Sequence, residues 1–410
     1  MPQLSAPLGH KLVVVLLLLM SMLGVFPLDV ILPSFPALAD YLSVSLKSIA
    51  FSVSVFAIGV AVSQAIIGPL SDTLGRKRLL LGGLVVSIIG ALGCVFSTGY
   101  EGFMFFRVVQ AFGCGSFVLS QALVQDIYPV KQQNALRILL LTVSGLLISL
   151  SPLLGSVLQR YLGWEGSFHV FIIVALVVLL MSWALLPEPP IPRVRGNPLM
   201  NLKALAADRV FLISSALSSL AFTCHFAFVV VSPLLLMGHL GLSEYQFAIV
   251  FVGYGVAYVV GGLVAGKLNG MMHPHAQMGC GLVLVGFAGL MLFIWQFSEG
   301  LSIANLMLPV TLSTIGVTII RPAATTYALS KHADRAGAAA SASNTLLFAS
   351  GGVASTVIAS FEKGLPIVLA SLFICAGLVG GLLLFYLRKR ERSACAINIV
   401  TKAREDATRC

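Results

Sequence analysis

The sequence predicts an all-α polytopic membrane protein with twelve transmembrane helices in two six-helix bundles. Three observations lead to this fold class. The 410 residues are 58% hydrophobic and only 10% charged, whereas a soluble domain is usually about 25% charged. The mean hydropathy is +1.00, and long apolar runs recur along the chain. The 39 glycines agree with this class, because glycine is more frequent in membrane helices than in soluble ones.

The apolar runs are long enough to cross a bilayer, which takes about 20 residues. We expect transmembrane helices at 12–36, 46–70, 79–98, 102–125, 136–160, 167–187, 209–237, 243–267, 277–297, 301–326, 337–360 and 364–387. The first run continues past Lys11 without a signal-peptide cleavage pattern, so we expect it to be retained. The widest gap follows the sixth run and is rich in proline and arginine, as a linker would be.

Six runs on either side of this gap suggest duplicated halves. The expected division is an N-terminal bundle (1–190), a cytoplasmic linker (191–208), a C-terminal bundle (209–387) and a basic cytoplasmic tail (388–410). Most of the 25 lysines and arginines then lie on one side of the membrane. By the positive-inside rule this side is cytoplasmic, and both termini lie there. The net charge of +10 therefore reflects membrane topology rather than a nucleic-acid partner.

The first inside loop, residues 68–78, reads GPLSDTLGRKR. Gly68 is expected to permit close helix approach and Gly75 to serve a tight turn. Asp72 is harder to explain, because acids contribute little to topology. The stretch resembles the signature loop of the major facilitator superfamily, G-x-L-x-D-x-x-G-R-[KR]-[KR], at nearly every position. A basic stop-transfer loop would account for Arg76 and the cations after it, but not for the other matches.

Three further stretches resemble motifs of the same family. FRVVQAFGCGS resembles its helix-4 motif R-x-x-Q-G-x-G, with Ala111 in place of the first glycine, a variant associated with Bcr/CmlA-type drug exporters. The proline pattern after Asp29, with Pro33 and Pro36, resembles the end of helix 1 in those exporters. GLLISLSPLLGS resembles the helix-5 antiporter motif, and it departs from that motif at Ser151, where a glycine usually precedes the proline. The motif residues carried over are Gly145, Pro152 and Gly155.

This resemblance implies a proton-coupled antiporter that exports small organic molecules or drugs across the bacterial inner membrane by alternating access. It implies a monomer in the lipid membrane, with the proton gradient as energy source and no cofactor. In the family the loop acid caps the inside end of helix 11, here near Gly337, and the loop arginine meets an acid at the inside end of helix 4. The implied cytoplasmic gate consists of Gly68, Asp72, Gly75, Arg76 and Asp126.

Asp29 is an isolated carboxylate among apolar residues and prolines. It lies about 27 Å from the inside end of the first helix, at a depth similar to that of Arg107 in the fourth. Charged groups inside a membrane usually face the bundle interior and find partners. We therefore expect Asp29 and Arg107 to form the proton-coupling site. A permanent structural ion pair, or an Asp29 at the outer water interface, is the alternative. Pro27 and Pro33 are expected to kink the helix and free backbone carbonyls there.

Other polar side chains on expected cavity faces are candidates for substrate contact: Gln64, Gln110, His225, Tyr254, Tyr258, Arg321 and Asn344. Ordinary hydrogen bonding between helices explains most of them equally well. His225 is either a proton relay or a neutral core histidine. Arg321 either extends along its helix to water or headgroups, or binds a carboxylate or phosphate of the substrate.

Alternatives within transport are export of an endogenous, anionic metabolite such as a siderophore, and proton-coupled uptake. An enzyme is not expected, because the sequence shows no intramembrane nucleophile–base set, paired acids or metal cluster. No P-loop motif occurs, so ATP is not the expected energy source. Scattered cysteines give no disulfide or metal-site spacing.

Overall fold

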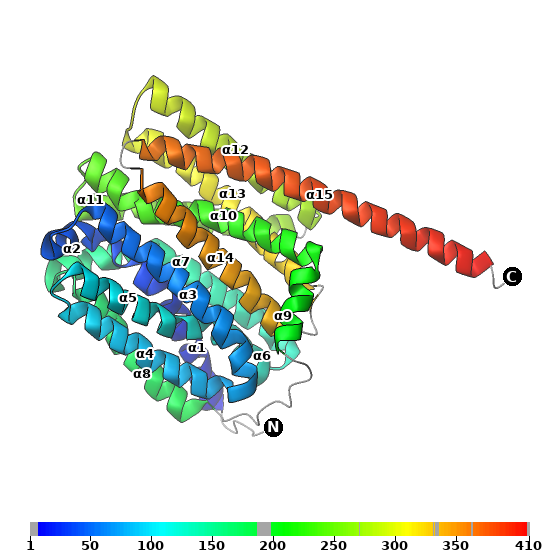
Figure 1. Ribbon diagram of the computed structural model, residues 1–410, viewed down its shortest axis with the longest axis horizontal. Helices are drawn as coiled ribbons and strands as arrows, with labels where there is room; N and C mark the ends of the chain where they lie inside the picture. The colour runs from blue at the N-terminus through cyan, green and yellow to red at the C-terminus, as the bar shows by residue number, and fades with distance from the viewer. Residues whose placement is uncertain are drawn as a thin grey trace.

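The computed structural model describes residues 7–186, 198–269, 271–330, 332, 336–361 and 364–407. All regular elements in these ranges are helices. Figure 1 shows the helices of the first half, blue to light green, beside those of the second half, green to orange. The chain therefore has the predicted all-α, two-bundle architecture.

The first half contains α1 (Pro7–Asp29), η1 (Leu32–Ser34), α2 (Phe35–Leu42), α3 (Leu46–Leu74), α4 (Arg76–Phe96), α5 (Tyr100–Cys114), η2 (Gly115–Val118), α6 (Leu119–Ile127), α7 (Val130–Leu162) and α8 (Gly166–Leu185). The second half contains α9 (Pro198–Ala207), α10 (Arg209–Pro233), η3 (Leu234–His239), α11 (Glu244–Asn269), α12 (Pro274–Ser298), α13 (Ile303–Ser330), α14 (Ala336–Ala359) and α15 (Leu365–Ala407). The helix α9 lies within the predicted linker, and residues 191–197 of that linker lie outside the described ranges.

Eleven segments of the described chain are long and apolar enough to cross a membrane. Each coincides with one predicted span. The span predicted at 136–160 is not among the eleven, but it falls within α7, which has 33 residues and is about 50 Å long. The first, fourth and seventh spans are each built from more than one helical piece.

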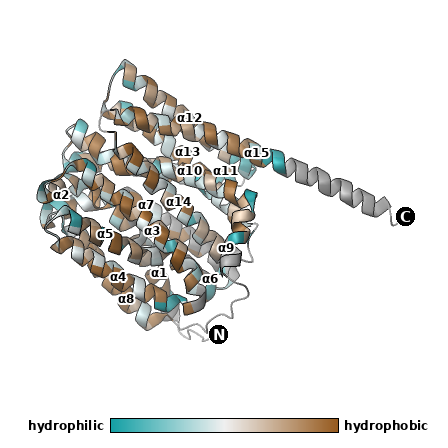
Figure 2. Cartoon of the chain, viewed as in Figure 1, coloured by the Kyte–Doolittle hydropathy of each residue, from teal (hydrophilic) through white to brown (hydrophobic). Residues whose placement is uncertain are grey.

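The spans differ in how deeply they are buried, which separates lining helices from lipid-facing ones. In α10 and η3, 94% of the apolar stretch is buried, whereas the figure is 33% for α8 and α15. A helix that is apolar all round belongs inside a bundle, and α10 accordingly packs against α13, α14 and α15. Figure 2 shows hydrophobic residues along the lengths of the outer helices, with hydrophilic residues nearer their ends. That pattern is the one a lipid-facing surface requires.

The two bundles meet along α3 and α14. Near one end of the pair Lys47 Nζ donates to the carbonyl of Ser360 at 3.3 Å. In the middle, the hydroxyls of Ser54 and Ser355 are 2.8 Å apart. Near the other end, the hydroxyl of Ser341 donates to the carbonyl of Gln64 at 2.9 Å. Small residues and short polar contacts therefore hold these helices together over most of their length.

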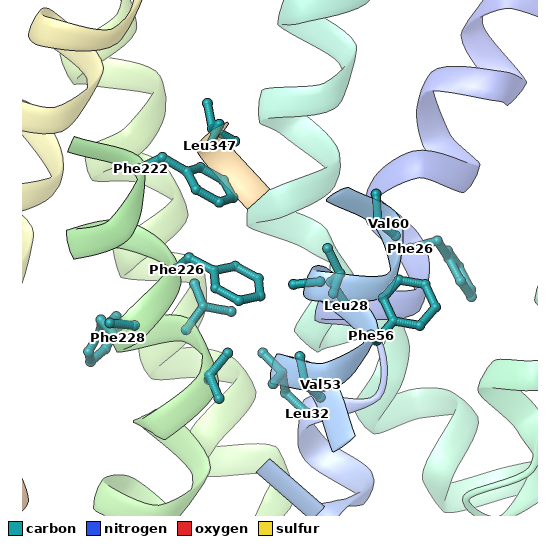
Figure 3. Close-up of a cluster of buried hydrophobic side chains, with 14 of the residues drawn as sticks. Phe26, Leu28, Leu32, Val53, Phe56, Val60, Phe222, Phe226, Phe228 and Leu347 are labelled. Atoms are coloured by element: carbon teal, nitrogen blue, oxygen red, sulfur yellow. The ribbon is translucent and has the colours of Figure 1, made fainter. Parts of the chain in front are cut away.

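A hydrophobic cluster closes the space between α1 and α10. Figure 3 shows Leu28 of α1 and Phe226 of α10 pointing toward one another, with Leu32 and Val53 nearby. All four side chains are buried. The cluster lies at the level of the break after α1, so the bundles are in apolar contact beside Asp29.

Helix α15 extends beyond the membrane span. It has 43 residues, about 65 Å at 1.5 Å per residue, and Figure 1 shows its C-terminal part projecting away from the bundle. The predicted basic tail thus continues the last transmembrane helix as far as Ala407 rather than leaving it at residue 387.

Candidate functional site

Helix α1 breaks at the carboxylate that stands out in the sequence. The α-helix ends at Asp29 and resumes as α2 after a 3-10 turn. Pro33 has no N–H to donate to the carbonyl of Asp29, four residues earlier, so the helix cannot continue through this point. The break also leaves carbonyls open to side chains, and the Pro27 carbonyl accepts a hydrogen bond from Arg107 Nη2 at 3.2 Å. The predicted proline break with freed carbonyls is present.

Arg107 is completely buried in the first bundle. Its Nη1 donates to Gln110 Oε1 at 2.8 Å, and its guanidinium carbon lies 4.3 Å from the centroid of the Phe56 ring. Arg107 Nε and Gln110 Nε2 are buried without a hydrogen-bond partner. A cavity of about 10 Å³ lies beside them, lined also by Phe26 and Ser167. A space of this size holds about one water molecule.

Asp29 does not pair with Arg107. The carboxylate is 6% exposed, and among the described residues it makes no hydrogen bond and no ion pair. Arg107 instead uses the Pro27 carbonyl and Gln110, so the permanent ion pair that the sequence left open as the alternative does not form. The turn η1, which begins three residues after Asp29, packs against α11 of the other bundle. The acid therefore lies at the interface between the bundles.

A second polar cluster lies in the C-terminal bundle. His225 Nδ1 in α10 is hydrogen-bonded to the hydroxyl of Tyr254 in α11, and the two rings are stacked with centroids 5.8 Å apart. One turn further along α11, Tyr258 Oη accepts a hydrogen bond from Arg321 Nη1 at 3.2 Å. The predicted i, i+4 tyrosine pair thus joins a histidine and an arginine from two other helices.

Arg321 points into this cluster rather than toward the nearer end of its helix. Side chains on a helix lean toward its N-terminus, so Arg321 leans back toward Ile303 and away from Ser330. Its guanidinium carbon lies 5.0 Å from the centroid of the Phe222 ring. The expectation that this arginine extends to water or headgroups therefore does not hold. The other outcome left open by the sequence, binding of a carboxylate or phosphate of the substrate, stays a prediction.

The remaining cavity candidates lie apart from the cluster. Gln64 is buried in α3, and its Oε1 has no hydrogen-bond partner. Asn344 is half-buried in α14, about one turn from Ser341. Among the described residues neither is hydrogen-bonded to Arg321 or His225. Gln110 serves Arg107 instead, in the first bundle.

The loop between α3 and α4 contains the contacts expected of a gate. Arg76 Nη1 lies 2.9 Å from Asp126 Oδ2 at the end of α6. Gly75 has a φ of 91°, in the region that glycine adopts without strain. A Cβ on Gly68 would lie 2.2 Å from the hydroxyl oxygen of Ser341, so the absence of a side chain permits the close approach of α14. The predicted capping contact depends on the side chain of Asp72, which lies outside the described residues.

The helix-5 motif packs against both bundles. A Cβ on Gly155 would lie 2.1 Å from the carbonyl oxygen of Val30, immediately after the break in α1. A Cβ on Gly145 would lie 3.5 Å from Cε1 of Tyr258 in α11. Pro152 is buried between them. The motif thus supplies a small-residue surface to α1 at one end and to α11 at the other.

Two features of the site escaped the sequence-based prediction. The first is the ring on which each arginine stacks, Phe56 for Arg107 and Phe222 for Arg321. Each ring lies in a different transmembrane span from its arginine. Phe222 is, however, three residues before His225 and shares its helix face. At the base of α10, Asp208 Oδ2 lies 3.0 Å from His332 Nε2, and Asp208 Oδ1 accepts from the N–H of Val210 at 2.8 Å. This acid therefore caps α10 and binds the loop before α14, which no local sequence signal connects.

The chain resembles known transporters over most of its length. A family model described as Major Facilitator Superfamily matches residues 15–356. The uncharacterized MFS-type transporter YdgK of Bacillus subtilis (strain 168) is 26% identical over 384 residues, which are 92% of this chain and 95% of the relative. A chloramphenicol resistance protein of Pseudomonas aeruginosa is 26% identical over 308 residues, covering 74% of this chain and 73% of the relative. A bicyclomycin resistance protein homolog of Haemophilus influenzae is 25% identical, with 84% and 88% covered.

Solved structures share the fold. A D-xylose-proton symporter superposes with a TM-score of 0.72 at 16% sequence identity, covering 90% of this chain and 97% of that one. The xylose transporter XylE from E. coli, in a partially occluded inward open conformation, gives a TM-score of 0.73 at 16% identity, with 92% and 97% covered. At this identity the likeness concerns the arrangement of helices.

Proposed function

The chain belongs to the Major Facilitator Superfamily, and we propose that it is a proton-coupled exporter of small organic molecules, including drugs. It is a multi-pass membrane transporter. Relatives named for chloramphenicol, bicyclomycin and multidrug resistance support export of drug-like compounds over uptake. The helix-5 motif, with its two glycines against α1 and α11, supports antiport. The proposed location is the bacterial inner membrane, with both termini in the cytoplasm and a monomer as the working unit.

One observation carries the proposed proton coupling. Asp29 is a buried carboxylate without a hydrogen-bond or ion-pair partner among the described residues, at a helix break between the bundles. A charged carboxylate in such surroundings is costly unless a proton or a cation neutralises it. Asp29 therefore has the property that an antiporter needs, since a proton and a positively charged group compete for the same oxygens. Arg107 acts indirectly, by holding the Pro27 carbonyl and fixing the break next to the acid.

Alternating access would convert this local competition into transport. The bundles contact one another along α3 and α14 and through the cluster around Leu28 and Phe226. Each state that opens to one side must break part of these contacts, so a ligand shifts the equilibrium only through its different affinity for the two states. The energy source in this proposal is the proton gradient, with no cofactor. The Arg76–Asp126 contact, with Asp72, would hold the cytoplasmic side closed.

Proton-driven export in proteoliposomes tests the proposal. Under an imposed pH gradient the native protein should move radiolabelled chloramphenicol uphill, and Asp29→Asn should abolish this movement, because an amide cannot exchange a proton. Asp29→Glu should retain part of the activity. Asp40→Asn is the matched control, since Asp40 is an exposed acid in the neighbouring α2. Uphill transport by the Asp29→Asn protein at the native rate would show that Asp29 is not the coupling site.

A further inference from the structure

We propose that Arg321 and Asp29 form the two poles of one substrate site, and that the exported class includes zwitterionic aromatic molecules. A carboxylate on the substrate would bind Arg321, and an amine would bind Asp29. This inference rests on the proposed export function and names the substrate chemistry of the same site.

Among the described residues, no acid contacts Arg321, so its charge has no counterion there. Its hydrogen bond goes to a neutral phenol, Tyr258 Oη, at 3.2 Å, and its guanidinium lies over the face of Phe222. Arg321 Nε is buried and has no hydrogen-bond partner. Phenol and ring hold the planar group in place without neutralising it. A guanidinium fixed in this way presents a ready fork to a carboxylate.

Among the described residues, the helices α10 to α13 offer no acid to pair with this arginine inside the membrane. Between residues 210 and 330 the sequence contains only Glu244 and Glu299. Glu244 begins α11, and Glu299 follows the last residue of α12, so both lie at helix ends. Glu244 is 14 positions from Tyr258, about 21 Å along the helix. A membrane-embedded arginine without an acidic partner is costly, and an anionic ligand would relieve this cost.

The two unpaired charges both lie close to α11. The turn η1, which begins three residues after Asp29, packs against α11, and Tyr258 of α11 accepts the hydrogen bond from Arg321. Asp29 and Arg321 form no ion pair with each other among the described residues. They belong to different bundles, so a molecule that bridges them would contact both halves of the transporter.

The signs of the charges select a zwitterion over an anion. A substrate with only a carboxylate would repel ionised Asp29 and would bind best when Asp29 is protonated, which favours movement in the same direction as the proton. An amine at Asp29 competes with the proton, as antiport requires. The aromatic surroundings of Phe222, His225 and the tyrosines suit a flat ring between the two charged groups.

Binding of a matched series of compounds tests this inference. The series is norfloxacin, which carries an amine and a carboxylate, its ethyl ester, which keeps only the amine, and its N-acetyl derivative, which keeps only the carboxylate. Their Kd values would be measured at pH 7.4 by fluorescence with the purified full-length protein. The native protein should bind the zwitterion roughly tenfold or more tightly than either derivative, the scale of a charged hydrogen-bond pair.

Variants separate the two poles. Arg321→Gln should weaken binding of the zwitterion roughly tenfold to a hundredfold and that of the ester by less than about threefold. Asp29→Asn should weaken the zwitterion and spare the N-acetyl derivative. Arg321→Lys should restore only part of the loss, because an ammonium lacks the planar fork. Arg209→Gln is the matched control: Arg209 also donates to a tyrosine hydroxyl, that of Tyr386 at 3.3 Å, but at the exposed start of α10.

The outcomes distinguish this inference from the proposed function. Equal binding of norfloxacin and its ester to the native protein overturns the inference, as does an equal loss of both in Arg321→Gln. If Arg321→Gln does not fold, Tyr258→Phe supplies the test, since it removes the phenol that holds the guanidinium and should selectively weaken the two carboxylates. Charge-selective binding without proton-driven transport of any compound would contradict the proposed export and leave the two-pole site standing. Proton-driven transport of chloramphenicol without charge-selective binding would contradict the two-pole site and leave the proposed export standing.

Discussion

At the scale of single residues, the two intramembrane arginines are held by neutral groups. Arg107 has an amide, a backbone carbonyl and the Phe56 ring, and Arg321 has a phenol and the Phe222 ring. The difference is burial: Arg107 is 0% exposed, whereas Arg321 is half-buried. We infer that Arg107 is a fixed structural support of the α1 break and that Arg321 is open to a ligand.

Replacing Arg107 by lysine tests the supporting role. Lysine keeps the charge, but it cannot donate to Gln110 and the Pro27 carbonyl from a planar fork and also stack on Phe56. We expect the protein to lose about 1.5–3 kcal/mol of stability, the range for a hydrogen bond to a charged group, together with most of its transport. Thermal unfolding in detergent and proteoliposome transport measure the two effects.

The control for that substitution is Arg160→Lys, at an exposed position in the last turn of α7, which should change neither quantity. An Arg107→Lys protein with native stability and native transport would show that the fork geometry at the break is unimportant.

At the scale of elements, the glycines decide how closely helices approach. Gly155 lets α7 touch the carbonyl at the break of α1, and Gly68 lets α3 approach Ser341 of α14. These contacts place a broken helix and a gate loop directly against their neighbours. A methyl group at Gly155 meets a backbone carbonyl oxygen, and one at Gly68 meets the hydroxyl oxygen and Cβ of Ser341, so in closely packed helices the neighbours must shift.

We expect Gly155→Ala to impair the protein through packing. Its Cβ would fall 2.1 Å from the Val30 carbonyl oxygen and 3.1 Å from Cδ of Pro33, so α1 and α7 must separate. Overpacking of this kind typically costs about 1–3 kcal/mol, and the displaced break should lower transport. The melting temperature and the initial rate of export are the measurements.

Gly262→Ala in α11 provides the opposite case, because nothing lies within 4 Å of a Cβ built there. Alanine is the better helix former, by up to about 1 kcal/mol, so this variant should be as stable as the native protein or more stable. Similar losses in both variants would mean that helix flexibility, not the contact with Val30, is what Gly155 supplies.

At the scale of the whole molecule, the bundles are in contact along α3 and α14. The contact runs from the Lys47–Ser360 hydrogen bond at one end to the Gln64–Ser341 hydrogen bond at the other. Opening toward the predicted cytoplasmic side requires Gly68 and Ser341 to separate. The Arg76–Asp126 ion pair holds the loop that follows Gly68. It is partly exposed, with 15% and 33% of the two side chains accessible, so its contribution is that of a surface pair, about 0.2–1 kcal/mol.

Asp126→Asn should therefore shift the population toward the inward-open state by up to about fivefold, the equilibrium equivalent of roughly 1 kcal/mol. A cysteine placed at Ser341 in a cysteine-free background reports the shift, because this position is buried against α3 in the closed arrangement. Its labelling by a membrane-impermeant maleimide from the cytoplasmic side should accelerate. Asp40→Asn, on the other side, should leave labelling unchanged, and an unaltered rate in Asp126→Asn would remove the ion pair from the gate.

The sequence by itself determined the architecture and much of the local chemistry. Hydrophobic run lengths fix the number of spans, because only a helix of about 20 residues satisfies its backbone across a bilayer. Proline positions fix the break after Asp29, because a missing N–H acts within four residues. The loop motif places Arg76 beside Asp126. The number of spans and the helix break depend on spacing within short stretches. The Arg76–Asp126 contact depends on a motif that is accompanied by that contact.

Only the tertiary structure decided which groups meet across helices. Asp29 and Arg107 lie at the same depth, but the choice between an ion pair and a carbonyl partner depended on rotation about the helix axes, which spacing along one chain does not specify. For Arg321 the sequence left open an extended side chain or an interior one, and the positions of Phe222 and Tyr258 on two other helices settled it. The orientation of a buried charge is set by the packed neighbours that can hydrogen-bond it, and these come from distant parts of the chain.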